Sequence, residues 1–206
     1  MNNTVRPPAG RLNPRHEELN MESEVRELLV EELKDAYSAE RQALRCMQKA
    51  LKMASAPALR EGIQLHIEQT QVQIERVERA MEQLEAKPGR KVCEAMRGLV
   101  EEAQHEIGEH DEKGPILDLV IVAGMQRIEH YEIAAYGTDV ALAEALGEKQ
   151  VAKLLAETLE EEKQTDLKLT EVTQKAIMPD ALAGEEEEEG GDERGGGRSG
   201  RRRKAA

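Results

Sequence analysis

Apolar residues recur at helical spacing in five stretches of the chain, so the sequence predicts a protein built from α-helices. The stretches run over about residues 22–53, 57–86, 92–110, 115–146 and 149–177. Residues that end helices separate them: "SAP" before the second, "KPGR" after it, "KGP" before the fourth and Gly147 after it. Pro57 and Pro115 suit the first turn of a helix, and Pro179 is expected to end the last one.

The lengths of the connections predict how the helices are arranged. Tight turns join the first long helix to the second and the third long helix to the fourth, so each pair is expected to form an antiparallel hairpin. The connection between the pairs contains the short helix at 92–110 and is long enough to cross over. We therefore predict an all-α, ferritin-like four-helix bundle with a long crossover that carries an extra short helix. An up-down-up-down bundle with the short helix packed outside is the alternative.

The two ends of the chain differ in composition from the part between them. Residues 1–20 are rich in Pro, Asn and Arg, and residues 179–206 contain an acidic block, then glycines, then a basic block. Such segments cannot bury a core, so we expect a disordered arm at 1–20, a bundle at 21–178 and a disordered tail at 179–206. The basic end, Arg201 to Lys204, offers a contact for an anionic partner, although a solvated tail is the simpler interpretation.

Composition supports the helical prediction and narrows the function. The chain has no Trp, no Phe and three Tyr, and is rich in strong helix formers. Its net charge of −13 argues against nucleic-acid binding by the bundle. Cys46 and Cys93 make no disulfide framework and are typical of free thiols in a reducing cytoplasm. The sequence contains no run of about 18 apolar residues and no secretory signal pattern, so we expect a cytoplasmic protein without a membrane partner.

Several acidic residues fall on the apolar faces of the long helices. At 100° per residue, Glu40 lies within the stripe of the first helix, and Glu132 lies within that of the fourth, with Glu129 at its edge. Glu162 is central in the last helix, and Asp166 lies one turn on and about 40° away. Anions cannot share a dry core unless they are protonated, paired with Arg or Lys, or bound to a cation. A divalent metal is the simplest solution, and oxygen ligands with some imidazole suit iron or manganese.

The helix at 57–86 is expected to complete the site, and it offers two mutually exclusive sets of ligands. His66 flanks one side of its apolar stripe, whereas Glu68 and Gln71 lie on the other side. A lone helical His is commonly a hydrogen-bonded core residue, and Glu68 alone is equally compatible with a solvated surface acid. The tyrosines are expected to fill this layer and to give their hydroxyls to the carboxylates: Tyr37, Tyr131 and Tyr136.

Four motifs in order resemble a known family over about residues 22–177. They are "LKDAYSAERQAL" (33–44), "LHIEQTQVQIERVE" (65–78), "IEHYEIAAYGT" (128–138) and "LAETLEEEKQTDLKL" (155–169). These segments are similar to the YciE/YciF-type, stress-associated family of ferritin-like proteins. The resemblance implies a bacterial, commonly dimeric bundle with a site similar to the di-iron site of rubrerythrin-type proteins.

The same resemblance implies roles for individual residues. Glu40 would be the ligand of the first helix, Glu129 and Glu132 an ExxE pair, and Glu162 the bridging acid of the last helix. Rubrerythrin-type proteins have two ExxH motifs, whereas here Thr165 follows Glu162 and Gln71 follows Glu68, which leaves fewer nitrogen ligands.

Together these observations predict a protein that binds two iron ions per chain, or two manganese ions, and reacts with a small oxidant, dioxygen or peroxide, in an oxidative or general stress response. The candidate metal ligands are Glu40, His66, Glu68, Glu129, Glu132, Glu162 and Asp166. No catalytic residue is assigned, and a homodimer is expected from the resemblance. One alternative is a non-enzymatic helical stress or scaffold protein whose inward acids are protonated or paired. Another is nucleic-acid binding through the basic tail.

Overall fold

A computed structural model of the chain describes residues 14–183, with side chains from residue 20 onwards. This part consists of α1 (Pro14–Met53), α2 (Pro57–Gln83), α3 (Glu94–Gly108), α4 (Pro115–Ala145) and α5 (Lys149–Val172), followed by the π-helical segment η1 (Thr173–Ile177) and a helical end at 178–183. The described residues form no β-strand, which confirms the predicted all-α class.

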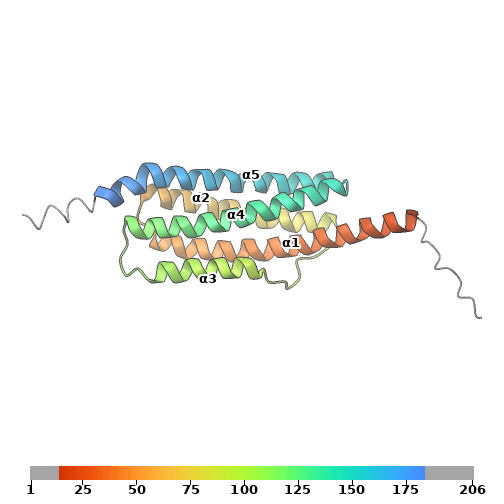
Figure 1. The fold of residues 1–206 in the computed structure, drawn as a ribbon, viewed down its shortest axis with the longest axis horizontal. Helices are drawn as coiled ribbons and strands as arrows, with labels where there is room; N and C mark the ends of the chain where they lie inside the picture. The colour runs from red at the N-terminus through yellow and green to blue at the C-terminus, as the bar shows by residue number, and fades with distance from the viewer. Residues whose placement is uncertain (1–13, 184–206) are drawn as a thin grey trace, which may run out of the picture.

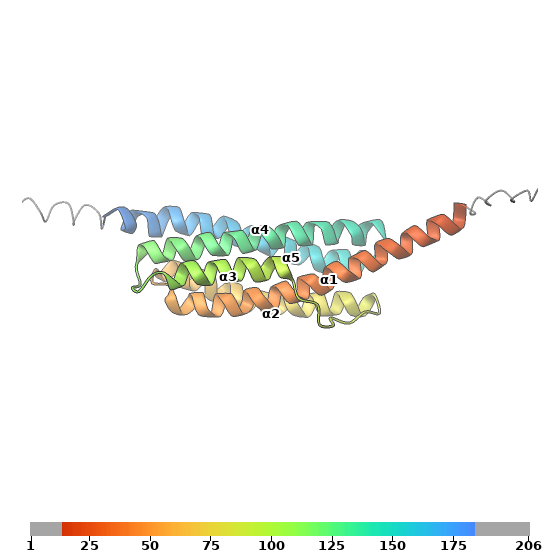
Figure 2. The same ribbon diagram turned by 60° about the horizontal axis from the view of Figure 1, so that its bottom comes forward.

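Four long helices lie side by side as a bundle, and α3 packs outside them against α1 and α4 (Figures 1 and 2). In Figure 1, α2 ends at the right of the molecule and α4 begins at its left, so α3 carries the chain back along the bundle. As a result α2 and α4 run in the same direction, while the pairs α1–α2 and α4–α5 are antiparallel. This is the predicted bundle with a long crossover, and the up-down-up-down alternative is wrong.

The apolar core is divided into two halves along the bundle axis. One half contains residues such as Leu33 and Leu155, from the part of the bundle where α2 ends and α5 begins. The other half contains residues such as Ile63 and Ile121, from the part where α2 and α4 begin. Each long helix passes from one half to the other, and it carries buried polar side chains at the crossing point. The fold therefore encloses a polar layer between two apolar regions.

A close approach between two helices fixes the position of α3. A Cβ atom placed on Gly124 of α4 would lie 2.9 Å from the Cβ of Ala103 on α3, so only glycine allows this contact without a shift of the backbone. Cys93 is the N-cap residue of α3, and its sulfur accepts a hydrogen bond from the backbone N–H of Met96 at 3.3 Å. Both cysteines are free thiols, as the composition suggests, and the structure buries both of them.

Two helix ends differ from the predictions. α1 begins at Pro14, so residues 14–20 are helical where a disordered arm was expected. Proline is well suited to the first helical position, because the N–H that it lacks has no partner there in any helix. At the other end the helix continues through Pro179 to residue 183. The π turn of η1 ends two residues before this proline and includes Lys175, four residues before it, so the widened turn relieves the conflict between the ring and the carbonyl of Lys175.

The remaining parts of the predicted arm and tail, residues 1–13 and 184–206, lie outside the described residues. Within residues 14–183, none of the helices combines the length and the apolar character needed to cross a bilayer.

Candidate metal centre

Five ionisable side chains from four helices meet in the polar layer of the bundle. Each is at most 3% exposed, and together they are Glu40 of α1, His66 of α2, Glu129 and Glu132 of α4, and Glu162 of α5. The helical phase explains this convergence, because residues that share the apolar face of a bundle helix all point toward its axis. In α4, Glu129 lies at the edge of the apolar stripe in the sequence, and the structure buries it as completely as Glu132.

The imidazole of His66 lies among the carboxylates. Its Nε2 atom is 3.1 Å from Oε1 of Glu129 and 3.6 Å from Oε2 of Glu162. One potential ligand atom from each of His66, Glu129, Glu132 and Glu162 can be chosen so that all four lie within 4.8 Å of one another. A single divalent ion bonds to oxygen and nitrogen ligands at about 2.0–2.2 Å. Two ligands of one ion are then at most about 4.4 Å apart, so these four atoms need only small side-chain shifts to surround one ion.

Glu40 approaches the same layer from α1. Its Oε1 atom accepts a hydrogen bond from the hydroxyl of Tyr136 at 2.5 Å, and its charge acts on His66 and Glu129. Glu40 thus adds a fourth carboxylate beside the four-residue group, and so many oxygen ligands are typical of sites that hold two ions.

Burial and mutual repulsion make these carboxyls hard to ionise. Burial raises the pKa of Glu40 to about 7, even though the hydrogen bond from Tyr136 lowers it. The pKa values of Glu132 and Glu162 are raised well above their ordinary range, first by burial and then by the charges of neighbouring glutamates. For His66, burial alone would lower the pKa, but the charge and hydrogen bond of Glu129 outweigh it and the pKa is raised.

Many of the carboxylate oxygens in this layer have no hydrogen-bond partner. Five are buried and unpartnered: Oε2 of Glu40, Oε2 of Glu129, Oε1 of Glu132, and Oε1 and Oε2 of Glu162. Among the described residues, no Lys or Arg forms an ion pair with any of these four glutamates. A buried acceptor without a partner costs roughly 1–3 kcal/mol, and more when it is charged. A divalent cation would remove that cost, so the residues present fit a metal.

The guanidinium of Arg76 pairs with a glutamate outside the cluster. Arg76 of α2 forms a two-pronged contact with Glu161, at 2.6 and 2.8 Å, and Gln73 donates to the same carboxylate at 2.9 Å. Burial would raise the pKa of Glu161, but the hydrogen bonds from Arg76 and Gln73 and the charge of Arg76 outweigh it, and the pKa is lowered. Glu161 therefore remains a paired carboxylate at the edge of the bundle, and Glu162 points into the interior.

Two of the predicted ligands, Glu68 and Asp166, lie outside this cluster. Glu68 is exposed and accepts a hydrogen bond from Gln64 at 3.0 Å. It lies two residues beyond His66, about 200° around α2, so burial of His66 turns Glu68 to water. Asp166 is partly exposed at the α4–α5 surface, where Gln126 donates to it at 3.0 Å. Its offset of about 40° from Glu162 is enough to take it out of the interior.

Of the three tyrosines expected to donate their hydroxyls to carboxylates of the buried layer, one does so. Tyr136 donates to Glu40, as described above. Tyr131 instead donates to Asp35 at 2.7 Å, and its oxygen lies 3.0 Å from the sulfur of Cys93 between α3 and α4. Tyr37 contacts Arg41, whose guanidinium lies 5.5 Å from the centre of its ring, away from the buried layer.

Some buried polar residues were not among the ligands predicted from the sequence. Thr165 lies three residues after Glu162, and its hydroxyl is 3.3 Å from Nδ1 of His66, which makes it a neighbour of the cluster. Asp139 is buried one heptad after Glu132, on the same face, and both of its carboxylate oxygens lack partners. The spacing of seven residues is the signal that identifies it. Asp118 is also buried, but its role is structural, because it accepts hydrogen bonds from the turn between α1 and α2.

Comparison with known proteins places the chain among helical bundles of the same kind. Residues 24–182 match the family described as "Domain of unknown function (DUF892)". The protein YciF of Escherichia coli (strain K12) is 44% identical over 155 residues, which are 75% of this chain and 92% of YciF.

Solved structures extend this comparison. The crystal structure of the E. coli stress protein YciF has 43% identity and a TM-score of 0.69, covering 72% of this chain and 94% of that one. YcfI from Rhodopseudomonas palustris has 40% identity and a TM-score of 0.68, covering 71% and 92%. A ferritin-like, diiron-carboxylate protein from Bacillus anthracis shares the fold alone, with 13% identity and a TM-score of 0.57, covering 72% and 97%. The fold is therefore ferritin-like, as predicted.

Proposed function

This chain belongs to the DUF892 family, and on that premise we propose that its bundle holds a pair of carboxylate-bound metal ions, iron or manganese, that reacts with dioxygen or peroxide. The observation that carries the proposal is the set of five buried, unpartnered carboxylate oxygens gathered around one imidazole. An oxygen-rich donor set with imidazole suits iron and manganese, and no thiolate lies among these residues to favour a softer metal.

The ligands that we assign to the metal ions are Glu40, His66, Glu129, Glu132 and Glu162, the residues that meet in the polar layer. Four ionised carboxylates carry as much negative charge as two divalent ions carry positive charge, so the loaded layer would be electrically neutral. The bound ions would supply electrons for the reduction of an O–O bond. The two apolar halves of the core exclude water from both sides of the layer.

Neighbouring hydroxyls orient two of these ligands. Thr165 donates its hydroxyl proton to the carbonyl of Glu161 at 3.1 Å, so the same oxygen can accept from Nδ1–H of His66 at 3.3 Å. A proton held on Nδ1 leaves the lone pair of Nε2 facing Glu129 and Glu162, where an ion would bind. In the same way Tyr136 holds one oxygen of Glu40 and leaves the other free.

A role in stress protection follows from the nature of the relatives. The E. coli protein is named a stress protein, and a centre that consumes dioxygen or peroxide would fit such a role in this chain as well. We extend the stress assignment to this protein on that basis.

Metal analysis of the purified full chain tests the proposal. After anaerobic reconstitution with Fe(II), we expect about two ions per chain and an absorption change on exposure to air. The paired substitution Glu129→Gln and Glu162→Gln should abolish metal binding, whereas Glu160→Gln, which changes an exposed acid on the same helix, should retain it. Wild-type protein without metal after reconstitution with iron and with manganese would refute the proposal.

A second candidate function is a helical scaffold without metal. The raised pKa values of Glu40, Glu132 and Glu162 favour it, because carboxyls that hold their protons need no cation. The name given to YcfI of R. palustris also points to a structural role. In that case Glu40→Gln combined with Glu162→Gln should raise the melting temperature and leave the cellular phenotype intact. Loss of the phenotype in this variant would favour the metal centre.

A further inference from the structure

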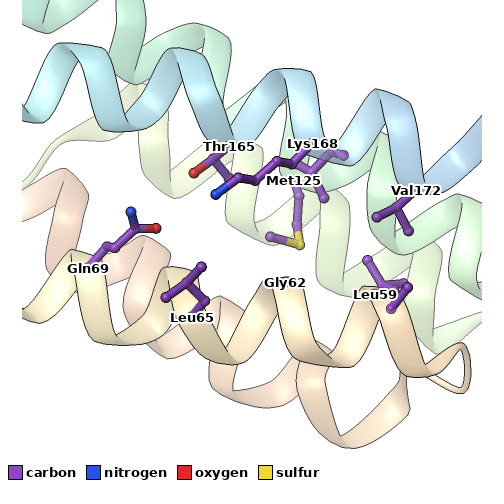
Figure 3. A pocket seen from close by; sticks show the side chains of 10 residues that line it. Leu59, Gly62, Leu65, Gln69, Met125, Thr165, Lys168 and Val172 are labelled. Atoms are coloured by element: carbon purple, nitrogen blue, oxygen red, sulfur yellow. The ribbon is translucent and has the colours of Figure 1, made fainter.

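A small cavity lies between α2 and α5, in the apolar half of the core next to the polar layer. Its volume is about 30 Å³. Figure 3 shows Leu59 and Val172 at one end, Gln69 and Thr165 at the other, and the sulfur of Met125 from α4 between the two helices. A water molecule needs about 10–15 Å³ of such space, so the cavity has room for one or two molecules of that size.

The wall that α2 contributes contains a glycine that packing does not require. Gly62 lies in the interior of a long helix, where glycine is less favourable than alanine by about 1 kcal/mol. A Cβ atom at this position would meet no heavy atom within 4 Å, in contrast to Gly124, where a neighbouring helix forbids a side chain. The missing side chain at Gly62 therefore leaves space in the wall of the cavity at a cost to helix stability.

The polar end of the cavity lies one side chain away from the metal centre. Thr165 lines the cavity, and its hydroxyl lies 3.3 Å from Nδ1 of His66. On the far side of the imidazole, Nε2 lies 3.1 Å from Glu129. The side chain of Thr165 therefore stands between the cavity and the ring of His66, which we assign as a metal ligand. At the outer side, the exposed Lys168 extends along α5 with its amino nitrogen toward Thr165 (Figure 3).

On the basis of the metal centre proposed above, we propose that this cavity is a binding site for dioxygen, separated from the metal centre by Thr165 and the imidazole of His66. Its volume excludes organic molecules larger than a few atoms. Its lining is mostly apolar and includes Leu59, Met125 and Leu169, so it favours an apolar diatomic molecule over hydrogen peroxide, which would lose hydrogen bonds to water. Dioxygen satisfies both conditions, and it is one of the two oxidants proposed for the centre.

Dioxygen itself can be used as the probe, on the metal-free full chain. Dissolved dioxygen is paramagnetic, so under oxygen pressure it speeds the NMR relaxation of methyl groups near its binding sites. We expect a several-fold larger effect on the methyl of Met125 than on those of Met81 and Met96, which are 0% exposed and do not line the cavity. Equal effects on the three methyls would overturn the proposal.

Filling the cavity provides the matched test. Gly62→Leu places a side chain in the open space and improves the helix propensity of α2, so the variant is expected to fold. Gly98→Leu is the control, because Gly98 is an exposed glycine of α3 with equally open surroundings. The excess relaxation at Met125 should disappear in Gly62→Leu and persist in Gly98→Leu. Persistence in both variants would contradict the assignment.

The iron-loaded protein supplies the second readout. Gly62→Leu should bind as much Fe(II) as wild type but oxidise it with dioxygen roughly tenfold more slowly, which corresponds to about 1.4 kcal/mol of added barrier. Unchanged oxidation by dioxygen, or slowing with hydrogen peroxide alone, would overturn the dioxygen site. A wild-type chain that binds no iron would refute the metal centre instead, and the relaxation of Met125 would still decide whether the cavity takes dioxygen.

Discussion

The hydroxyl of Tyr136 on α4 donates a hydrogen bond of 2.5 Å to Oε1 of Glu40 on α1, across the interior of the bundle. Both residues are 1% exposed, so water replaces neither partner. Burial first, and then the charge of Glu40, raises the pKa of Tyr136 well above its ordinary value, which keeps the phenol a proton donor. This contact holds one oxygen of Glu40 in place and leaves the other oxygen for a metal ion.

Removal of that hydroxyl should weaken metal binding more than it perturbs the fold. In Tyr136→Phe the ring still fills the core, but Glu40 loses the partner that orients it. Substitutions of such outer partners typically cost 10–100-fold in metal affinity, and we expect a loss of about that size. Competition with a chromophoric chelator under anaerobic Fe(II) measures it. Tyr37→Phe, which removes a hydroxyl outside the layer, serves as the control, and equal affinities for the two variants would contradict this role of Tyr136.

A pair of conservative substitutions can decide which residue of α2, His66 or Glu68, binds the metal. His66→Gln should reduce the metal content strongly, because it replaces the one imidazole among the ligands that we assign. Glu68→Gln should leave the metal content unchanged, since Glu68 is exposed and bonded to Gln64. Elemental analysis after reconstitution gives the answer. A loss of metal in Glu68→Gln with retention in His66→Gln would contradict our assignment of His66 as the ligand from α2.

Helical phase alone predicts most of the interior of this protein. Glu40, Glu132 and Glu162 fall within apolar stripes, and the structure buries all three. The same reasoning could not choose between His66 and Glu68, because both flank the stripe of α2 and the choice depends on how far the helix is rotated about its axis. That rotation is set by packing against α1 and α5, which a single helix does not encode.

Contacts between helices were the part that the sequence could not supply. The sequence shows Thr165 where rubrerythrin-type proteins have a histidine, but not that its hydroxyl lies against His66, 99 positions away. Helix ends were also uncertain, because Pro179 usually ends a helix and is accommodated here by a π turn. Local rules therefore predict which residues are buried, and packing decides which of them meet.

Asp118 should be important for stability and not for metal binding. Its carboxylate accepts hydrogen bonds from the backbone N–H groups of Ser55 and Ala56, at 2.7 and 2.8 Å, and from the hydroxyl of Ser55 at 2.6 Å. Asp118→Ala should lower the free energy of unfolding by roughly 2–4 kcal/mol, because buried donors lose their acceptor. Urea denaturation measures the loss, and Asp111→Ala, at an exposed position before α4, should change it by less than about 0.5 kcal/mol.

The raised pKa of Asp139 predicts how the stability of the metal-free protein depends on pH. Burial, followed by the charges of Glu32 and Asp35 on α1, raises its pKa from 3.8 to about 8. A carboxyl whose pKa is raised on folding favours the folded state while it is protonated. Its contribution is complete below pH 3.8, the value for the unfolded chain, and is lost as the pH rises through about 8.

Asp139→Asn should remove this pH dependence, because an amide cannot lose the proton. The variant should gain stability over wild type as the pH rises from 5 to 9, by an amount on the order of 2–4 kcal/mol, since one pKa unit corresponds to about 1.36 kcal/mol. Urea denaturation of both metal-free proteins at several pH values isolates the effect, because the other carboxyls titrate in each. For Glu144→Gln, at an exposed position of α4, the free energy of unfolding should depend on pH as it does in wild type. If Asp139→Asn also parallels wild type, Asp139 is ionised in the folded protein and water or an ion must reach it.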